Sequence, residues 1–356
     1  MWSYMASALG ILSPIEGTAT GTPPSNQDSD IERSSFRLRC RGWHDRENEL
    51  FLSVPKNTTA CCNAIFFPGD VQDFKATMDA GPFADYSDYA YEAVAELLSE
   101  KFGSTCNVWV VRPSRFKHGA YSSFDNFVTT NEYGAATKCT NDPTAFATKH
   151  LASLMQNTQA TLRRQGGTDL SSFEVNVSTA LPMHLLGFSK GGIVLNQLVT
   201  ELVRYSFNKK RSNCGQVRQG SVFASTRQFF AAIYSIHWLD AGNGSLVGAM
   251  PTEETALAVL SRYEQLRLFV HVTPYQYEAR QRPWIKTEVN SFVNKMNVLG
   301  ADIQLIIYYE GDEGSLASHF HILQDFEASR SFKSKGEGVV NSPEHAVQPV
   351  RIRVCT

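Results

Sequence analysis

The sequence predicts a doubly wound α/β fold, in which a mostly parallel sheet carries helices on both faces. Two observations predict it. Short apolar runs alternate along the chain with stretches of helical period, which is typical of parallel strands joined by crossover helices. In addition, the apolar run 183–188 leads directly into Gly187-Phe188-Ser189-Lys190-Gly191 and then into a helical pattern. This is the strand–turn–helix context of a nucleophile elbow.

The elements are expected in a regular order. An opening hairpin of 37–43 and 49–54 is indicated by alternating polarity. Buried strands are expected at 62–67, 107–111, 183–188, 229–239, 267–273 and, as the last strand, 303–309. Helices are expected at 86–101, from Asp142-Pro143 to about Arg164, and at 190–207, 253–266 and 284–299.

One hydrolase-type domain is expected over residues 33–330. Residues 1–32 are expected to be a disordered leader, because they are rich in Gly, Thr, Pro and Ser, and 331–356 a polar tail. Two insertions interrupt the domain: a loop or cap at about 112–141 and a polar surface insertion at about 209–225.

Composition excludes several classes of function. The net charge is −2 and no dense basic stripe exists, so nucleic acid is not an expected partner. No apolar run reaches the roughly 20 residues of a membrane span, and the opening segment lacks the basic n-region of a secretory signal. The seven cysteines are irregularly spaced without a CxxC pair, which predicts a reduced protein with neither a zinc site nor a disulfide framework. No cofactor or metal is expected.

Ser189 is the candidate nucleophile. Its flanking glycines let strand and helix approach closely, and the backbone N–H of Lys190 is free to face an oxyanion. Gly69 allows a second N–H, that of Asp70 or Val71, to point into the same site. The alternative for Pro68-Gly69-Asp70 is an ordinary turn with a solvated aspartate.

Asp240 and His319 are the candidate acid and base. Each follows a predicted strand, and the chain order Ser189, Asp240, His319 is that of the α/β-hydrolases. His319 is preferred to His321 because it lies nearer the loop, whereas a helical segment begins at about 322. Asp240 has an alternative role in a turn or helix cap. Glu278 is the alternative acid, with a nearby arginine as a possible ion-pair partner.

Three other polar side chains have less certain roles. The side chain of Lys190 is expected either to be solvated at the helix start or to attract an anionic substrate. His184 and His271 lie within predicted strands and are expected to be structural.

The chain resembles a eukaryotic family of α/β-hydrolase-like proteins associated with mitochondria. The similarity runs from about Phe36 to Phe326. The matching segments are Pro68-Gly69-Asp70-Val71-Gln72-Asp73, Phe124-Asp125-Asn126-Phe127-Val128, Gly187-Phe188-Ser189-Lys190-Gly191, Trp238-Leu239-Asp240, His271-Val272-Thr273-Pro274-Tyr275-Gln276, Arg282-Pro283-Trp284-Ile285, and Ser315-Leu316 with His319-Phe320. The chain departs from the family at Ala241-Gly242-Asn243, where Gly-Gly-His is common, and at Ala279, where an acidic residue is common.

The resemblance implies an α/β-hydrolase core with a serine hydrolase site, and it favours Asp240 over Glu278 and His319 over His321. An esterase, lipase or thioesterase activity on a small acyl substrate is expected, with an aromatic cap of Tyr121, Phe124 and Phe127 suited to lipid or acyl-carrier esters. The alternative is an inactive hydrolase fold that serves as a binding or scaffold module. The resemblance implies a mitochondrial location; without it, a cytoplasmic one is expected. A protein partner is left open.

Overall fold

The structure, a computed structural model, describes residues 31–142, 144–165, 177–178, 180–206, 229–244, 247–328 and 350–352. The expected insertion at 209–225 lies outside these residues. So do the expected leader, except for its last two residues, and the expected tail, except for 350–352.

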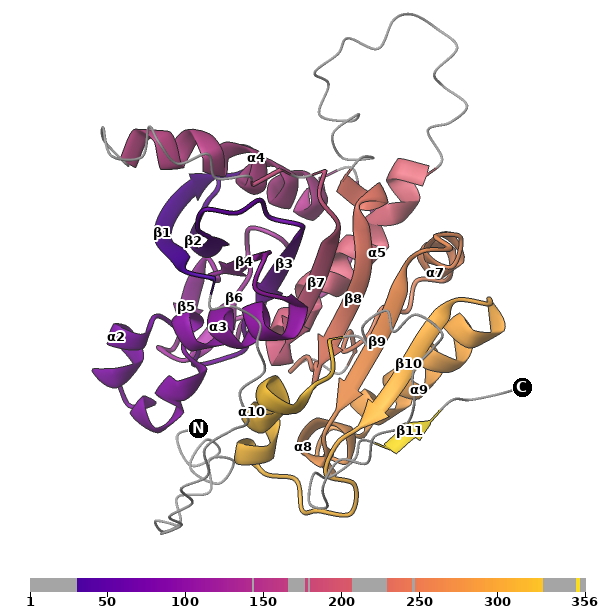
Figure 1. Cartoon of the computed structure of the whole chain (residues 1–356). Coiled ribbons are helices and arrows are strands. Elements are labelled where there is room, and N and C mark those ends of the chain that lie inside the picture. Colours follow the sequence, from indigo (N-terminus) through magenta and orange to yellow (C-terminus); the bar gives the residue numbers. More distant parts are fainter. Residues whose placement is uncertain are drawn as a thin grey trace, which may run out of the picture.

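Nine strands of the described residues form one sheet (Figure 1). Their spatial order is β1 (Arg33–Arg41), β2 (Glu47–Pro55), β4 (Cys106–Val111), β3 (Cys62–Phe67), β7 (Met183–Phe188), β8 (Ile233–Leu239), β9 (Arg267–Val272), β10 (Asp302–Ile307) and β11 (Val350–Ile352). All pairs from β4 to β10 are parallel, whereas β2 and β11 run antiparallel to their neighbours. The crossover of β3 and β4 followed by sequential parallel strands is the strand order of the α/β-hydrolase fold, as predicted.

Helices cover both faces of this sheet (Figure 1). One face packs against α4 (Ala147–Gln165), α5 (Gly192–Ser206), α7 (Glu254–Leu260) and α9 (Pro283–Val298). The other packs against α3 (Tyr91–Phe102) and α10 (Leu316–Asp325). Short helices α2 (Lys75–Asp79), η1 (Ala84–Tyr89), η3 (Ser189–Gly191) and α8 (Pro274–Tyr277) lie in the connections.

The sequence pattern explains this double winding. Every residue of β3 and β4 is buried, because each strand has helices on both sides, and a strand of that kind reads as a continuous apolar run. The opening strand β1 alternates instead, with Leu38 and Cys40 turned to the core and Arg37 and Arg39 on the outer face. An alternating pattern therefore marks the strand at the edge of the sheet, and a nearly continuous apolar run marks the strands at its centre.

Several expected elements differ from the structure in their bounds, among them the helix expected at 86–101, which is divided into η1 and α3. Three further differences concern the segment 112–141, the last strand and the start of β8. The segment 112–141 is not only loop, since it contains a hairpin of β5 (Arg115–Lys117) and β6 (Tyr121–Ser123). Strands of three residues are too short to show a period of two. The strand at 303–309 is not the last, because β11 pairs with it from the expected tail. Finally, β8 starts at Ile233, after a buried helical turn at Phe229 and Phe230 that is equally apolar.

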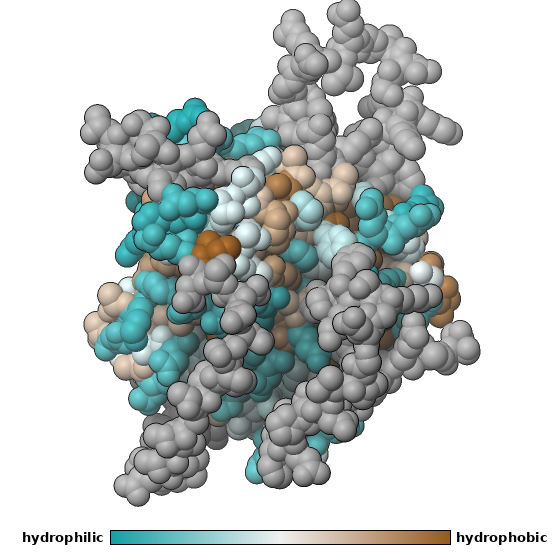
Figure 2. Space-filling model, in the orientation of Figure 1, coloured by the Kyte–Doolittle hydropathy of each residue, from teal (hydrophilic) through white to brown (hydrophobic). Residues whose placement is uncertain are grey.

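The surface of the described residues is largely polar. Figure 2 shows teal, hydrophilic residues over much of the face seen in Figure 1, with brown in smaller patches. Among large apolar side chains of the described residues, only Val247, Val298 and Leu299 are classed as exposed. None of the helices in the described ranges is both long enough and apolar enough to cross a membrane.

Candidate active site

Ser189 lies in a tight left-handed turn between β7 and α5. Its φ is 51°, a value that is uncommon for a residue other than glycine. The neighbouring glycines are required by close contacts: a Cβ on Gly191 would lie 2.0 Å from Phe67 O, and one on Gly187 would lie 2.8 Å from Gly192 Cα. Ser189 itself remains half-buried. The sequence thus places this serine at the carboxyl edge of the sheet, above the N-terminus of a helix.

Asp240 and His319 are hydrogen-bonded to each other. His319 Nδ1 lies 2.6 Å from Asp240 Oδ2, and the carboxylate is fully buried at the end of β8. Thr273 completes the environment of Asp240: its N–H donates to Oδ1 at 2.8 Å and its hydroxyl donates to Oδ2 at 2.6 Å. Three donors therefore hold the carboxylate in one orientation, facing the imidazole.

His319 lies within a helix rather than in the preceding loop. Helix α10 begins at Leu316 because Ser315 and Ser318 form a capping box, in which each hydroxyl accepts from the other residue's backbone N–H. The expected helix start near 322 was therefore wrong by about two turns. His319 is 3% exposed and its ring stacks on Phe188 at 4.6 Å. His321 is exposed.

Glu278 lies apart from this hydrogen-bonded pair. Its side chain is about half exposed and forms an ion pair with Lys286 at 3.6 Å, rather than with the arginine that the sequence suggested. It follows α8, a short helix that turns the chain away after β9. Glu278 has no hydrogen bond to a histidine among the described residues.

The loop after β3 brings Gly69 against the serine. A Cβ on Gly69 would lie 2.8 Å from Ser189 Cβ, so only glycine fits this approach. Val71 N–H is engaged, because it donates to Ala120 O at 2.9 Å. Of the two expected donors on this loop, Asp70 N–H is the one with no partner among the described residues. Val71 has a φ of 62°, which is strained for a β-branched residue.

Lys190 is neither solvated nor free, which corrects the expectation of a solvated lysine. Its side chain is 8% exposed, and Nζ lies 2.8 Å from Asp70 Oδ2 and donates to Tyr133 O at 2.8 Å. Nζ also lies 4.8 Å from the centre of the Tyr121 ring. The two residues expected to supply oxyanion donors are thus joined by their own side chains.

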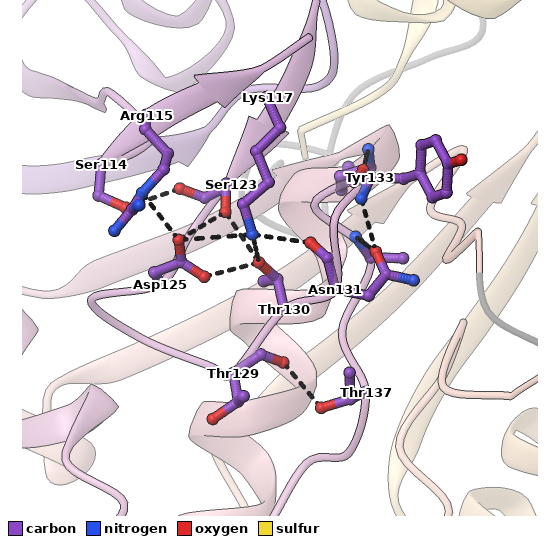
Figure 3. A network of polar contacts seen from close by, with 12 residues as sticks. Ser114, Arg115, Lys117, Ser123, Asp125, Thr129, Thr130, Asn131, Tyr133 and Thr137 are labelled. Atoms are coloured by element: carbon purple, nitrogen blue, oxygen red, sulfur yellow. Dashed lines mark hydrogen bonds and ion pairs between the residues drawn. The ribbon is translucent and has the colours of Figure 1, made fainter.

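A network around Asp125 supports this wall of the site (Figure 3). The carboxylate accepts from two hydroxyls and lies near two cations: Ser123 Oγ at 2.9 Å, Thr130 Oγ1 at 2.6 Å, Arg115 at 3.0 Å and Lys117 at 3.7 Å. Lys117 also donates to Asn131 O at 2.7 Å. The network holds the segment of Asn131 and Tyr133, which lines the same cavity as Ser189.

Ser189 and His319 line one cavity of about 530 Å³. No hydrogen bond joins Ser189 Oγ to His319 in the described residues. The aromatic side chains of the cavity are Phe83, Tyr86, Tyr121, Tyr133, Tyr275, Trp284 and Phe320. Of the expected cap residues only Tyr121 lines it; Phe124 and Phe127 are buried and pack against Phe67, which corrects that part of the prediction.

The sequence analysis missed several residues of the cavity. Tyr275, Gln276, Arg282 and Trp284 all line it, from α8 and the start of α9. They belong to segments that match the motifs of the family, and this match is the signal that could have identified them. Tyr275 lies 4.6 Å from the His319 ring, and burial raises the pKa of its hydroxyl.

A second group of histidines crosses the sheet away from the cavity. Ser235 Oγ lies 2.7 Å from His184 Nδ1 and 2.8 Å from His237 Nε2. His237 Nδ1 lies 3.2 Å from His271 Nε2, and His271 Nδ1 lies 3.0 Å from Tyr308 OH. We call His184, His237 and His271 the sheet histidines. Burial lowers the pKa of His271 to about 3 and of His184 to about 4.

No group of three or more His, Cys, Asp or Glu side chains is placed to hold a metal ion within the described ranges. The five described cysteines are free thiols: Cys40, Cys61, Cys62, Cys106 and Cys139.

Solved structures similar to this chain include esterases. Carboxyl esterase 2 from Tuber melanosporum is 13% identical, with 85% of this chain and 84% of that chain covered and a TM-score of 0.41. Esterase Est22 is 12% identical, with 83% of this chain and 75% of that chain covered and a TM-score of 0.40.

Curated relatives span most of the chain. The mitochondrial protein C2orf69 homolog of Danio rerio is 27% identical over 303 residues, which cover 80% of this chain and 82% of the relative. Mitochondrial protein C2orf69 of Homo sapiens is 28% identical over 306 residues, with 74% of each chain covered. The mitochondrial location implied by the resemblance is supported by these names. Because the sequence profile of the family matches residues 38–179 and 169–302, this chain belongs to the C2orf69 family.

Proposed function

We propose that this protein is a serine hydrolase that cleaves acyl esters or thioesters, with Ser189 as nucleophile, His319 as general base and acid, and Asp240 as the carboxylate that orients the imidazole. One observation carries the proposal. A buried carboxylate lies 2.6 Å from a histidine nitrogen, and that histidine lines the same cavity as a serine held in a left-handed turn. The turn has the form of a nucleophile elbow.

The reaction then follows from the residues present. Ser189 Oγ attacks the acyl carbon while His319 Nε2 takes its proton, and Asp240 stabilises the imidazolium through Nδ1–H. The N–H groups of Asp70 and Lys190 face the developing oxyanion. His319 returns the proton to the leaving oxygen or sulfur, and a water molecule repeats the sequence to release the acid.

The proposed reaction requires the Ser189 hydroxyl and the His319 imidazole to come into hydrogen-bond contact. Both side chains line the cavity without a hydrogen bond between them. Catalytic hydrogen bonds of this kind are often long in the unliganded enzyme and shorten when substrate binds. In the proposed reaction, rotation of the half-buried Ser189 side chain brings its hydroxyl to the imidazole, which Asp240 and, through Asp240, Thr273 hold in place.

The names of the relatives support action in mitochondria, and the size of the cavity supports a small acyl substrate. The cavity volume of about 530 Å³ lies within the range of small-molecule sites, roughly 300–1,000 Å³. Its aromatic lining suits an apolar acyl chain.

Labelling with a fluorophosphonate probe tests the proposal. The wild-type chain and Ser35→Ala, a change at an exposed serine on edge strand β1, are expected to react, and Ser189→Ala is not. Circular dichroism confirms that each variant is folded. If the folded wild type does not react, or if Ser189→Ala reacts equally, the enzyme proposal is rejected in favour of a hydrolase fold used for binding.

A further inference from the structure

Arg282 brings an unpaired positive charge to the wall of the cavity. Its guanidinium donates a long hydrogen bond, 3.4 Å, to Tyr275 O, also interacts with the Tyr275 hydroxyl, and lies 5.4 Å from the centre of the Tyr275 ring. No carboxylate lies within 4.0 Å of it among the described residues. Glu278, four positions earlier in the chain, forms its ion pair with Lys286 instead.

The other charged groups of the cavity compensate one another. Lys190 and Asp70 form an ion pair at 2.8 Å. Asp240 does not line the cavity; it is fully buried behind His319 and accepts three hydrogen bonds. An anion entering the cavity therefore meets one uncompensated charge, that of Arg282.

Arg282 lies on the side of the site where a leaving group departs. In the proposed reaction the leaving atom receives its proton from His319, so the leaving group must contact that imidazole. Tyr275 packs on the His319 ring at 4.6 Å, and Arg282 packs on Tyr275. A leaving group that extends along Tyr275 reaches the guanidinium.

Two buried polar atoms in the same wall lack partners. Gln276 Oε1 and Trp284 Nε1 have no hydrogen bond among the described residues, although both residues line the cavity. Buried groups of this kind are usually satisfied, and an exception in a site is a place where a ligand completes the bonding. After a small side-chain rotation, the indole N–H suits an anion oxygen and the amide oxygen suits an O–H or N–H of the same ligand.

We infer that Tyr275, Gln276, Arg282 and Trp284 form a leaving-group subsite, and that the substrate is an ester or thioester whose alcohol or thiol carries a phosphate or carboxylate. The inference rests on the proposed function. The carbonyl–oxygen or carbonyl–sulfur bond breaks, water supplies the hydroxyl of the acid, and the leaving oxygen or sulfur gains a proton through His319. The anionic group keeps its charge and serves only for recognition by Arg282.

Three butyryl thioesters with different leaving groups test the subsite on the full chain. The thiols are 2-mercaptoethanol, 2-mercaptoethyl phosphate and thioglycolate, and the rate of butyrate release gives kcat/KM. Wild type is expected to prefer the two anionic thioesters. Arg282→Gln should lose about 10- to 100-fold on those two and less than about twofold on the neutral one, in line with a charged hydrogen bond. Arg282→Lys should retain part of the preference, and Arg280→Gln, at an exposed arginine two residues away, all of it.

Comparing the phosphate thioester with the carboxylate thioester identifies which anion is recognised. A higher kcat/KM for either of them than for the neutral thioester supports the subsite. Equal losses on the neutral and anionic thioesters, or no loss, would overturn it. Calorimetric binding of 2-mercaptoethyl phosphate and of thioglycolate gives a readout independent of turnover. If no thioester is cleaved but either anion binds wild type and not Arg282→Gln, the enzyme proposal falls and the anion subsite stands; if neither anion binds and none is cleaved, both fall.

Discussion

His319 and the sheet histidines occupy two regions of one core with different consequences for proton transfer. Both regions are buried: His319 is 3% exposed, and His237 and His271 are fully buried. They differ in their partners. His319 faces a carboxylate through Nδ1 and lines a cavity, whereas the nitrogens of the sheet histidines face one another, Ser235 and Tyr308. Burial disfavours the protonated form of an imidazole, whereas a hydrogen-bonded carboxylate stabilises it.

The electrostatics of the sheet histidines follow from this difference. Desolvation lowers the pKa of His237 well below its usual value, and the neighbouring rings of His271 and His184 lower it further. No carboxylate among the described residues contributes to offsetting this effect on His237. These rings therefore stay neutral in the folded protein and act as hydrogen-bonding links between strands.

Substitution of Asp240 gives the largest expected effect. Asp240→Asn keeps the shape but removes the charge that fixes and stabilises the imidazole, so ester turnover should fall by about 10³- to 10⁴-fold, as in serine proteases. Glu278→Gln, at the alternative acid, should change kcat/KM by less than about twofold. Steady-state kinetics on the neutral butyryl thioester measures both. A loss in Glu278→Gln as large as in Asp240→Asn would exchange the roles of the two carboxylates.

The pH dependence of the free energy of unfolding tests whether the sheet histidines are neutral in the folded protein. The pKa of His271 is about 3 in the folded state and 6.5 without the fold, so between these values the unfolded chain binds the extra proton. Stability is therefore full above pH 6.5 and falls as the pH drops from 6.5 toward 3, by about 1.4 kcal/mol per unit for a fully buried histidine.

The matched variant is His271→Gln, in which the titrating ring is replaced by a neutral amide. Urea unfolding at pH 7 and at pH 5 should show a smaller difference between the two pH values in this variant than in wild type. An unchanged difference would mean that the histidine titrates normally, and that it does not differ from an exposed one.

Much of the architecture was predictable because it is written in local patterns. The strands at 62–67 and 183–188 coincide with their predicted ranges, since strands covered on both faces are bounded by turn residues and are largely apolar. Chain order also indicated which serine, aspartate and histidine to compare. The contact between Asp240 and His319, 79 positions apart, is a property of strand order and could not be read from spacing.

The surroundings of the site were less predictable, because they depend on which face a side chain takes. Phe124 and Phe127 were expected in the cavity by composition alone, yet they pack against Phe67 in the core. Lys190 was expected either to be solvated or to attract an anionic substrate, but its ammonium group pairs with Asp70 from another loop. In both cases the partner comes from a distant segment, and no local pattern encodes it.

The smallest expected effects come from removing one hydroxyl group in each region, next to Asp240 or between the sheet histidines. Thr273 Oγ1 donates to Asp240 Oδ2, and Ser235 Oγ lies between two sheet histidines. Thr273→Val removes one hydrogen bond to the carboxylate and should lower kcat/KM about tenfold, with Asp240 still held by the Thr273 N–H. Ser235→Ala removes the hydroxyl partner from the buried His237 ring and the half-buried His184 ring, and should lower the free energy of unfolding by about 1–3 kcal/mol while kcat/KM is unchanged. If Ser235→Ala slows turnover while stability is constant, the sheet histidines take part in the chemistry. A hydrogen-bonded carboxylate would then not be the feature that separates a catalytic imidazole from a structural one.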